Sequence, residues 1–167
     1  MFDVKQRLEH LHAAMPELRL YALVDGVQYQ ARFHEPLASA PGFFPLFVGT
    51  PDAALSHAGP WLVDIAESGE NVADDLIALE RELPSVSWLI ASQDLTGLAQ
   101  LLQLRLDARL PDGRCALLRF WDPRVLAALG RTLDGEQRTE FFNYIHEWHL
   151  LLDGQRVMIG RRNATSD

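Results

Sequence analysis

Two histidines near the C-terminal end of the chain have the residue types of a metal site. The segment His146-Glu147-Trp148-His149 resembles the helical zinc-protease motif, in which two histidines four residues apart bind the metal and a glutamate is the base. Here the histidines are three residues apart, a spacing that can still place two imidazoles on one helical face. Because no Cys or His cluster accompanies them, we expect no metal site and interpret the segment as the solvated flank of a helix.

Other side chains that could carry catalysis lack the partners that this chemistry needs. Ser92 does not lie in a Gly-x-Ser-x-Gly elbow, and Cys115 has no paired histidine recognisable in the sequence. We interpret Cys115 as a buried structural thiol within a strand. The carboxylates Asp74-Asp75 have the setting of a surface helix, and isolated glycines form no phosphate-binding loop. The sequence therefore predicts neither an enzyme nor a cofactor.

Three charged residues lie inside expected strands or directly after them. Asp25 follows the first strand, Arg119 lies inside the apolar run 115–121, and Asp122 follows that run. An arginine among apolar neighbours needs a carboxylate, because burying it unpaired is costly. We expect Asp25 to pair with Arg119, with both strands in one sheet. The preferred interpretation of Asp25, Arg119 and Asp122 is a structural polar network, and a partner-binding role for them stays open.

Apolar spacing predicts the elements that must position these residues. Residues 2–15 and 72–83 each place apolar side chains on one helical face, and Ser92 or Asp94 caps a further helix. Short apolar runs bounded by Gly or Pro predict strands. These runs are residues 18–24, 44–48, 61–65 and 86–90. Residues 27–42 lack a clear period and fit either helix or loop.

The segment 104–121 predicts a hairpin. Residues 104–110 alternate apolar and charged side chains, which indicates a strand buried on one face only. Pro111-Asp112-Gly113 supplies the turn, since glycine readily takes a positive φ. The returning run 115–121 is apolar on both faces except at Arg119, so we expect it to be a central strand of the sheet.

Helix-terminating residues organise the C-terminal third. Asp122 has the place of an N-cap, Pro123 that of the first helical residue, and Gly130 that of the residue just past the end. Asp134 and Gln137 have the spacing of a capping box. The helix that this box opens is expected to carry Phe141, Ile145 and Trp148 on one face, and a hairpin around Asp153-Gly154 closes the chain.

Together these patterns indicate the α/β class, with α+β as an alternative. We expect a single domain over residues 1–160 with a mixed β-sheet, flanking helices and a C-terminal helical part. The polar residues 161–167 are expected to form a frayed tail.

The composition narrows the classes of function. The chain has 167 residues, the length of one domain, and a net charge of −8, which argues against nucleic acid as a partner. It has one cysteine and therefore no intramolecular disulfide, and the sequence shows neither a signal-peptide core nor a membrane-spanning stretch. We expect a cytoplasmic protein that does not bind membranes.

Four short blocks, read in order, resemble the bacterial type VI secretion effector chaperone/adaptor family. The resemblance covers roughly residues 19 to 150. Its most distinctive block is the last, where Trp121 stands in the place of the family's usual tyrosine. The blocks are Tyr21-Ala22-Leu23-Val24-Asp25-Gly26, Pro45-Leu46-Phe47-Val48-Gly49-Thr50, Gly59-Pro60-Trp61-Leu62-Val63 and Arg119-Phe120-Trp121-Asp122-Pro123-Arg124-Val125-Leu126.

The resemblance implies a cytoplasmic adaptor without catalytic activity. Such proteins bind a cognate toxin effector and promote its loading onto the spike protein, VgrG. We expect the protein to be monomeric when free. Candidate contacts with a partner are Trp121, Arg124, Phe47 and Trp61, although core packing is the better interpretation of each aromatic ring. The alternatives are a hydrolase-like enzyme or an antitoxin-like immunity protein that uses the region of Asp25, Arg119 and Asp122.

Overall fold

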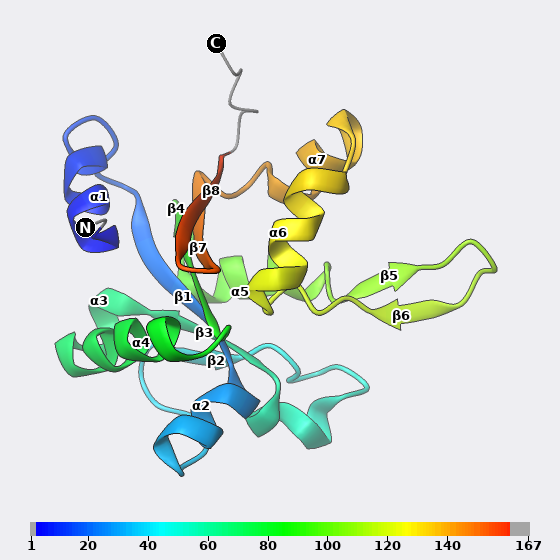
Figure 1. Cartoon of the computed structure of the whole chain (residues 1–167), viewed down its shortest axis with the longest axis horizontal. Coiled ribbons are helices and arrows are strands. Elements are labelled where there is room, and N and C mark those ends of the chain that lie inside the picture. Colours follow the sequence, from blue (N-terminus) through cyan, green and yellow to red (C-terminus); the bar gives the residue numbers. More distant parts are fainter. Residues whose placement is uncertain (1–2, 161–167) are drawn as a thin grey trace.

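A six-stranded sheet in the order β2-β3-β1-β4-β7-β8 organises the molecule (Figure 1). The structure is a computed structural model that describes residues 3–160. The expected tail, residues 161–167, lies outside the described residues. The strands are β1 (Arg19–Asp25), β2 (Phe43–Pro45), β3 (Pro60–Asp64), β4 (Val86–Ala91), β7 (Glu147–Leu152) and β8 (Gln155–Gly160).

The α/β class with flanking helices is confirmed, but the sheet is antiparallel rather than mixed. Both β3 and β4 pair antiparallel to β1, and every other neighbouring pair in the sheet is antiparallel as well. The strands β3 and β4 do run in the same direction, as their helical connection suggests. Since β1 lies between them and runs the opposite way, no two neighbours are parallel.

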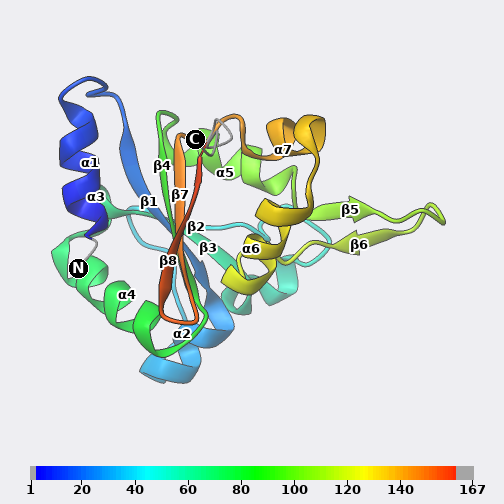
Figure 2. The same ribbon diagram turned by 45° about the horizontal axis from the view of Figure 1, so that its top comes forward.

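Helices cover both faces of this sheet. Alternation along β1 turns Leu20, Ala22 and Val24 to one face and Tyr21 and Leu23 to the other. The first face packs against α1, α2 and α4, and the second against α5, α6 and α7 (Figure 2). The helices are α1 (Val4–His12), α2 (Gly26–Phe33), η1 (Ala53–Ala58), α3 (Ile65–Ser68), α4 (Glu70–Glu82), α5 (Leu95–Gln103), α6 (Pro123–Thr132) and α7 (Gly135–Phe142).

Most elements of the first hundred residues were predicted from spacing. The apolar faces predicted for residues 2–15 and 72–83 pack on the sheet as α1 and α4. The ambiguous segment 27–42 begins with helix α2, and the expected strand 44–48 is only the three residues of β2. Residues 46–49 form a turn instead, where Gly49 has a φ of 72°.

The run 115–121 is not a central strand. Only Cys115–Leu117 forms a strand, β6, which pairs with β5 (Asp107–Arg109) in a separate two-stranded sheet. Phe120 and Trp121 are buried by ring contacts with Phe47 and Trp148 rather than by strand pairing. A short apolar run is compatible with either form of burial, so its sequence alone cannot decide between them.

The C-terminal helices are confirmed, with different ends. The capping box of Asp134 and Gln137 is present, but α7 stops at Phe142, and Trp148 lies in β7. Gly130 lies inside α6 and not past its end. A glycine is needed there because α6 passes close to β8. A Cβ atom at Gly130 would lie 2.9 Å from Ile159 Cδ1. The closing hairpin at Asp153-Gly154 is confirmed.

Candidate functional site

Asp25 caps helix α2 and is buried. Its Oδ1 accepts hydrogen bonds from the backbone N–H of Val27 at 2.9 Å and of Gln28 at 3.4 Å. Burial raises the pKa of this carboxyl, and the two backbone donors and the charge of Arg119 only partly offset that effect. The side chain thus stabilises the start of α2, at the end of the central strand β1.

Asp122 caps helix α6 in the way that the sequence predicts. Its Oδ1 accepts the Arg124 N–H at 2.9 Å, and the Arg124 guanidinium adds bonds of 3.0 Å and 2.8 Å. Burial opposes ionisation, but these bonds from Arg124 hold the pKa of Asp122 below its ordinary value. The Arg124 side chain itself is 62% exposed, so its outer surface is open to solvent.

Arg119 does not form the buried ion pair expected with Asp25. Its side chain is exposed, because the segment that carries it is irregular rather than a central strand. The guanidinium carbon lies 5.9 Å from the centre of the Trp121 ring, and its charge lowers the pKa of both Asp25 and Asp122. The three residues therefore lie near one another as a loose cluster around two helix caps.

Three of the four residues expected to contact a partner lie in the core. Phe47, Trp61 and Trp121 are 5%, 3% and 3% exposed, respectively. Core packing, the interpretation preferred from the sequence, is thus confirmed for each ring. Trp121, at the start of α6, is buried edge-to-face against Phe47, with 5.6 Å between the ring centres. Of the four, Arg124 alone is exposed.

Residues 104–119 form an arm that leaves the body of the molecule between α5 and α6, with the β5–β6 hairpin as its outer part (Figures 1 and 2). The arm carries three of the seven large apolar residues that are exposed in the described chain. These are Leu104 at 71%, Leu110 at 38% and Leu117 at 40%. A lone two-stranded hairpin is at best marginally stable in water, so a surface that completes it is favourable.

The arm is also basic, in contrast to the chain as a whole. It contains four arginines and two aspartates, a net charge of +2, whereas the chain carries −8. Arg109 and Arg119 are exposed and form no ion pair within residues 3–160. Exposed leucines thus share this surface with unpaired arginines, and arginine is enriched in protein–protein interfaces.

A hollow of about 210 Å³ lies where the base of the arm meets α7. Arg105 crosses it, and its Nη2 donates to the Glu140 carbonyl at 2.8 Å. On the other side, the Gln103 amide donates to the carbonyls of Leu46 at 3.0 Å and Val48 at 2.9 Å, tying the 46–49 turn to the end of α5. Val48 is 48% exposed, so this turn adds an apolar residue beside the arm.

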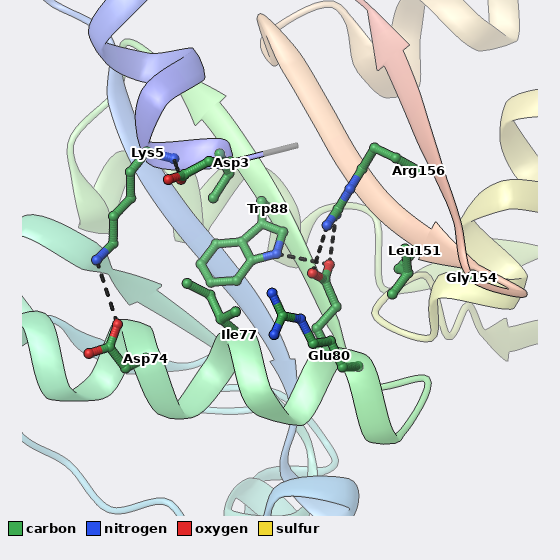
Figure 3. Close-up of a pocket in the computed structure, with 11 residues that line it drawn as sticks. Asp3, Lys5, Asp74, Ile77, Glu80, Trp88, Leu151, Gly154 and Arg156 are labelled. Carbon is green, nitrogen blue, oxygen red and sulfur yellow. Dashed lines mark hydrogen bonds and ion pairs between the residues drawn. The ribbon is translucent and has the colours of Figure 1, made fainter. Parts of the chain in front are cut away.

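A larger cleft of about 570 Å³ lies between α1, α4 and the β4–β7–β8 part of the sheet (Figure 3). Glu80 is buried at its floor, where Trp88 Nε1 donates at 2.9 Å and two Arg156 nitrogens donate at 2.8 Å. At the rim, Lys5 Nζ lies 2.7 Å from Glu70 and 3.9 Å from Asp74. Both Glu80 oxygens accept hydrogen bonds from the protein, so this carboxylate joins α4 to β4 and β8 at the floor of the cleft.

Residues 147–149 lie in a buried strand, and His146 lies half-buried in the bend before it, so the segment is not the solvated helix flank that we expected. Glu147 and His149 are 4% and 3% exposed in β7, where Trp148 alternates with them to the opposite face. Arg7 of α1 donates to Glu147, and the His149 Nε2 lies 2.8 Å from the same carboxylate. The run of apolar residues after His149 and the alternation around Trp148 were the signals for a strand.

Neither Asp25, Arg119 nor Asp122 lines the cleft or the smaller hollow. Within residues 3–160, no group of three or more His, Cys, Asp or Glu side chains could hold a metal ion. No helix in this range has the length and apolar character needed to cross a membrane. The strongest candidate site is therefore the arm with its neighbouring turn, a surface suited to contact a protein.

Comparison with known proteins gives one match. A family described as "Domain of unknown function (DUF4123)" matches residues 20–140, which is more than half of the chain. The matched range begins in β1 and includes the arm, the Asp25–Arg119–Asp122 cluster and α6. No curated protein and no solved structure gives a significant match. The chain therefore belongs to the DUF4123 family.

Proposed function

We propose that this protein is a cytoplasmic adaptor that binds a cognate type VI secretion toxin effector and promotes its loading onto the VgrG spike, without catalysis of its own. The observation that carries the proposal is the arm, which presents exposed leucines and the unpaired Arg109, with the unpaired Arg119 at its base, in a chain of this family. The ordered sequence blocks that resemble the effector chaperones supply the identity of the partners.

The arm is suited to contact the effector for an energetic reason. Burying the exposed part of Leu110 and Leu117 against a partner removes apolar area from water, at roughly 25 cal/mol for each Å². Arg109 and Arg119 can then meet acidic groups at the rim of the contact, which steers association and fixes its orientation. The same surface leaves the core undisturbed, so the adaptor can bind and release without unfolding.

An enzyme that uses Asp25, Arg119 and Asp122 has less support. Asp25 and Asp122 both accept backbone N–H bonds as helix caps, and Asp122 is further engaged by Arg124. A catalytic carboxylate needs an accessible oxygen within reach of the substrate in a concave site. The raised pKa of Asp25 is a feature of active sites, but here burial under α2 causes it.

Co-expression with the product of a neighbouring toxin gene tests the proposal. We expect the two proteins to co-purify, and we expect secretion of the effector, but not of the spike, to fail when the adaptor gene is deleted. Normal effector secretion in the deletion strain would contradict the proposal. An immunity protein would instead rescue cells from the toxin, so a toxicity assay in the same strain separates the two functions.

Substitutions on the arm test its role. Leu117→Asp places a charge on an exposed position of β6 and should weaken co-purification by at least about tenfold, because the charge must be desolvated at the contact. Leu55→Asp is the matched control, since Leu55 is 56% exposed but lies in η1, outside the arm. Equal binding of the effector by both variants would show that the arm is not part of the contact.

A further inference from the structure

The two edges of the main sheet differ in how they are protected. The edge strand β2 has three residues and ends in Pro45, which cannot donate a backbone hydrogen bond. The opposite edge, β8, has six residues, Gln155–Gly160, and contains no proline. Its one charged residue, Arg156, turns its guanidinium to the buried Glu80. Short strands, proline and outward charge are the usual guards against added strands, and β8 has none of them between residues 155 and 160.

The hairpin geometry shows which backbone groups face the open side of β8. Asp153 and Gly154 have φ of 49° and 77°, the two positive values of a two-residue type I′ turn. Leu152 and Gln155 flank this turn as a hydrogen-bonded pair, and pair types alternate from there along the ladder. Met158 opposite His149 is thus a non-hydrogen-bonded position. Its N–H and C=O point away from β7, toward the edge.

Between residues 157 and 159, the side chains at this edge are apolar on both faces. Met158 is 48% exposed on the face that carries the large cleft, while Val157 and Ile159 lie on the face covered by α6. Cross-strand neighbours of such residues are favourable when they are aliphatic or β-branched. The edge therefore suits an uncharged, extended segment of apolar residues.

We propose that β8 is completed by an extended apolar strand of the effector, which pairs with the Met158 N–H and C=O and continues the sheet. This inference rests on the proposed function, because the effector donates the strand. A second copy of this chain is a poorer occupant, since each copy carries a charge of −8 and repels the other. The chain that flanks an effector strand can add contacts in the cleft, which Arg156 of β8 lines.

Amide hydrogen exchange on the free adaptor and on its complex with the co-expressed effector tests this pairing. In the free protein, the inward-pointing amides of Val157 and Ile159 should exchange slowly and that of Met158 rapidly. In the complex, the Met158 amide should slow by at least about tenfold while its two neighbours stay slow. Unchanged exchange at Met158 in a complex that does form would overturn the inference.

Two substitutions at one position separate backbone from side-chain contact. Met158→Pro removes the outward donor and should weaken binding by about tenfold, whereas Met158→Ala keeps the donor and should bind nearly as the parent does. Equal losses in both variants would mean a side-chain contact and would overturn strand addition. If neither variant binds the effector more weakly, strand addition is also overturned, but the proposed adaptor function still stands. If the unaltered proteins do not co-purify at all, the proposed function fails and this inference fails with it.

Discussion

Arg7 of α1 and Glu147 of β7 form a forked ion pair across 140 residues of sequence, with Arg7 Nε 3.1 Å and 3.0 Å from the two carboxylate oxygens. The carboxylate is 6% exposed, and His149 Nε2 lies 2.8 Å from one of its oxygens. α1 buries Val4 and packs the half-buried Leu8 and Leu11 on the sheet, and this ion pair adds a polar contact between the helix and β7.

This pair predicts a specific loss of stability in acid. Burial opposes ionisation of Glu147, but its bonds with His149 and Arg7 lower its pKa from 4.5 to about 2. Because the pKa of Glu147 is lower in the folded state than in the unfolded chain, its ionised carboxylate stabilises the fold above pH 4.5. This contribution is lost as the pH falls from 4.5 toward 2. The shift corresponds to up to about 3 kcal/mol. Urea unfolding should show a steeper decline in this window for the parent than for Glu147→Gln. If the free energy of unfolding falls equally with pH in the parent and in Glu147→Gln, the ion pair between Arg7 and Glu147 is contradicted.

Asp122 and Arg119 should differ in their effect on stability. Asp122→Ala removes the N-cap of α6 and should lower the free energy of unfolding by about 1 kcal/mol. Arg119→Ala should change it by less than about 0.5 kcal/mol, because Arg119 is exposed and has no ion-pair partner within residues 3–160. Thermal or urea unfolding of both variants measures the difference. A larger loss of unfolding free energy for Arg119→Ala would instead support the buried ion pair with Asp25 that the sequence predicts.

Gly26 should not tolerate a side chain. A Cβ atom there would lie 2.4 Å from the His57 carbonyl oxygen and 2.6 Å from that of Gly59. Gly26→Ala must therefore shift the backbone and should cost about 1 to 3 kcal/mol in unfolding free energy. Gly135→Ala is the control, because Gly135 also begins a helix but has no atom within 4 Å of the added Cβ. That variant should be neutral or slightly stabilised. Similar melting temperatures for the two would refute the crowding at Gly26.

Cys115 should react with a thiol reagent in the folded state. It is the only cysteine of the chain and is exposed on β6, although its sequence context indicated a buried thiol. We expect a maleimide to label the native protein at about the rate seen in denaturant, and bound effector to slow labelling if the arm is covered. Resistance to labelling without denaturant would contradict the exposed arm.

The sequence predicted the parts of the fold that depend on local chemistry. The caps Asp122 and Asp134 are such cases, because a short carboxylate before a helix acts on N–H groups two or three residues away. The strand 18–24 was also predictable, since burial on both faces leaves a nearly continuous apolar run. Strand direction was not, because it depends on β1 lying between β3 and β4.

The candidate site was predicted less well, and the reasons are physical. Residues 115–121 read as a buried strand, since apolar residues on an exposed arm have the same pattern as those of a core strand. The pairing of Glu147 with Arg7 and of Glu80 with Arg156 joins residues far apart in the chain, and no local spacing indicates it. No local pattern indicates that Gly26 lies against the backbone of the segment before β3.

The arm leaves and rejoins the body at nearly the same place, because the Leu118 N–H donates to the Leu106 carbonyl at 2.6 Å. This hydrogen bond joins the two ends of the outer segment, residues 107–117. The six-stranded sheet forms no strand pair with that segment. Mutations, insertions and shortenings in the outer segment thus encounter few constraints from the rest of the chain. Under the proposed function, substitutions in the arm can therefore change which effector is bound without changing the six-stranded sheet.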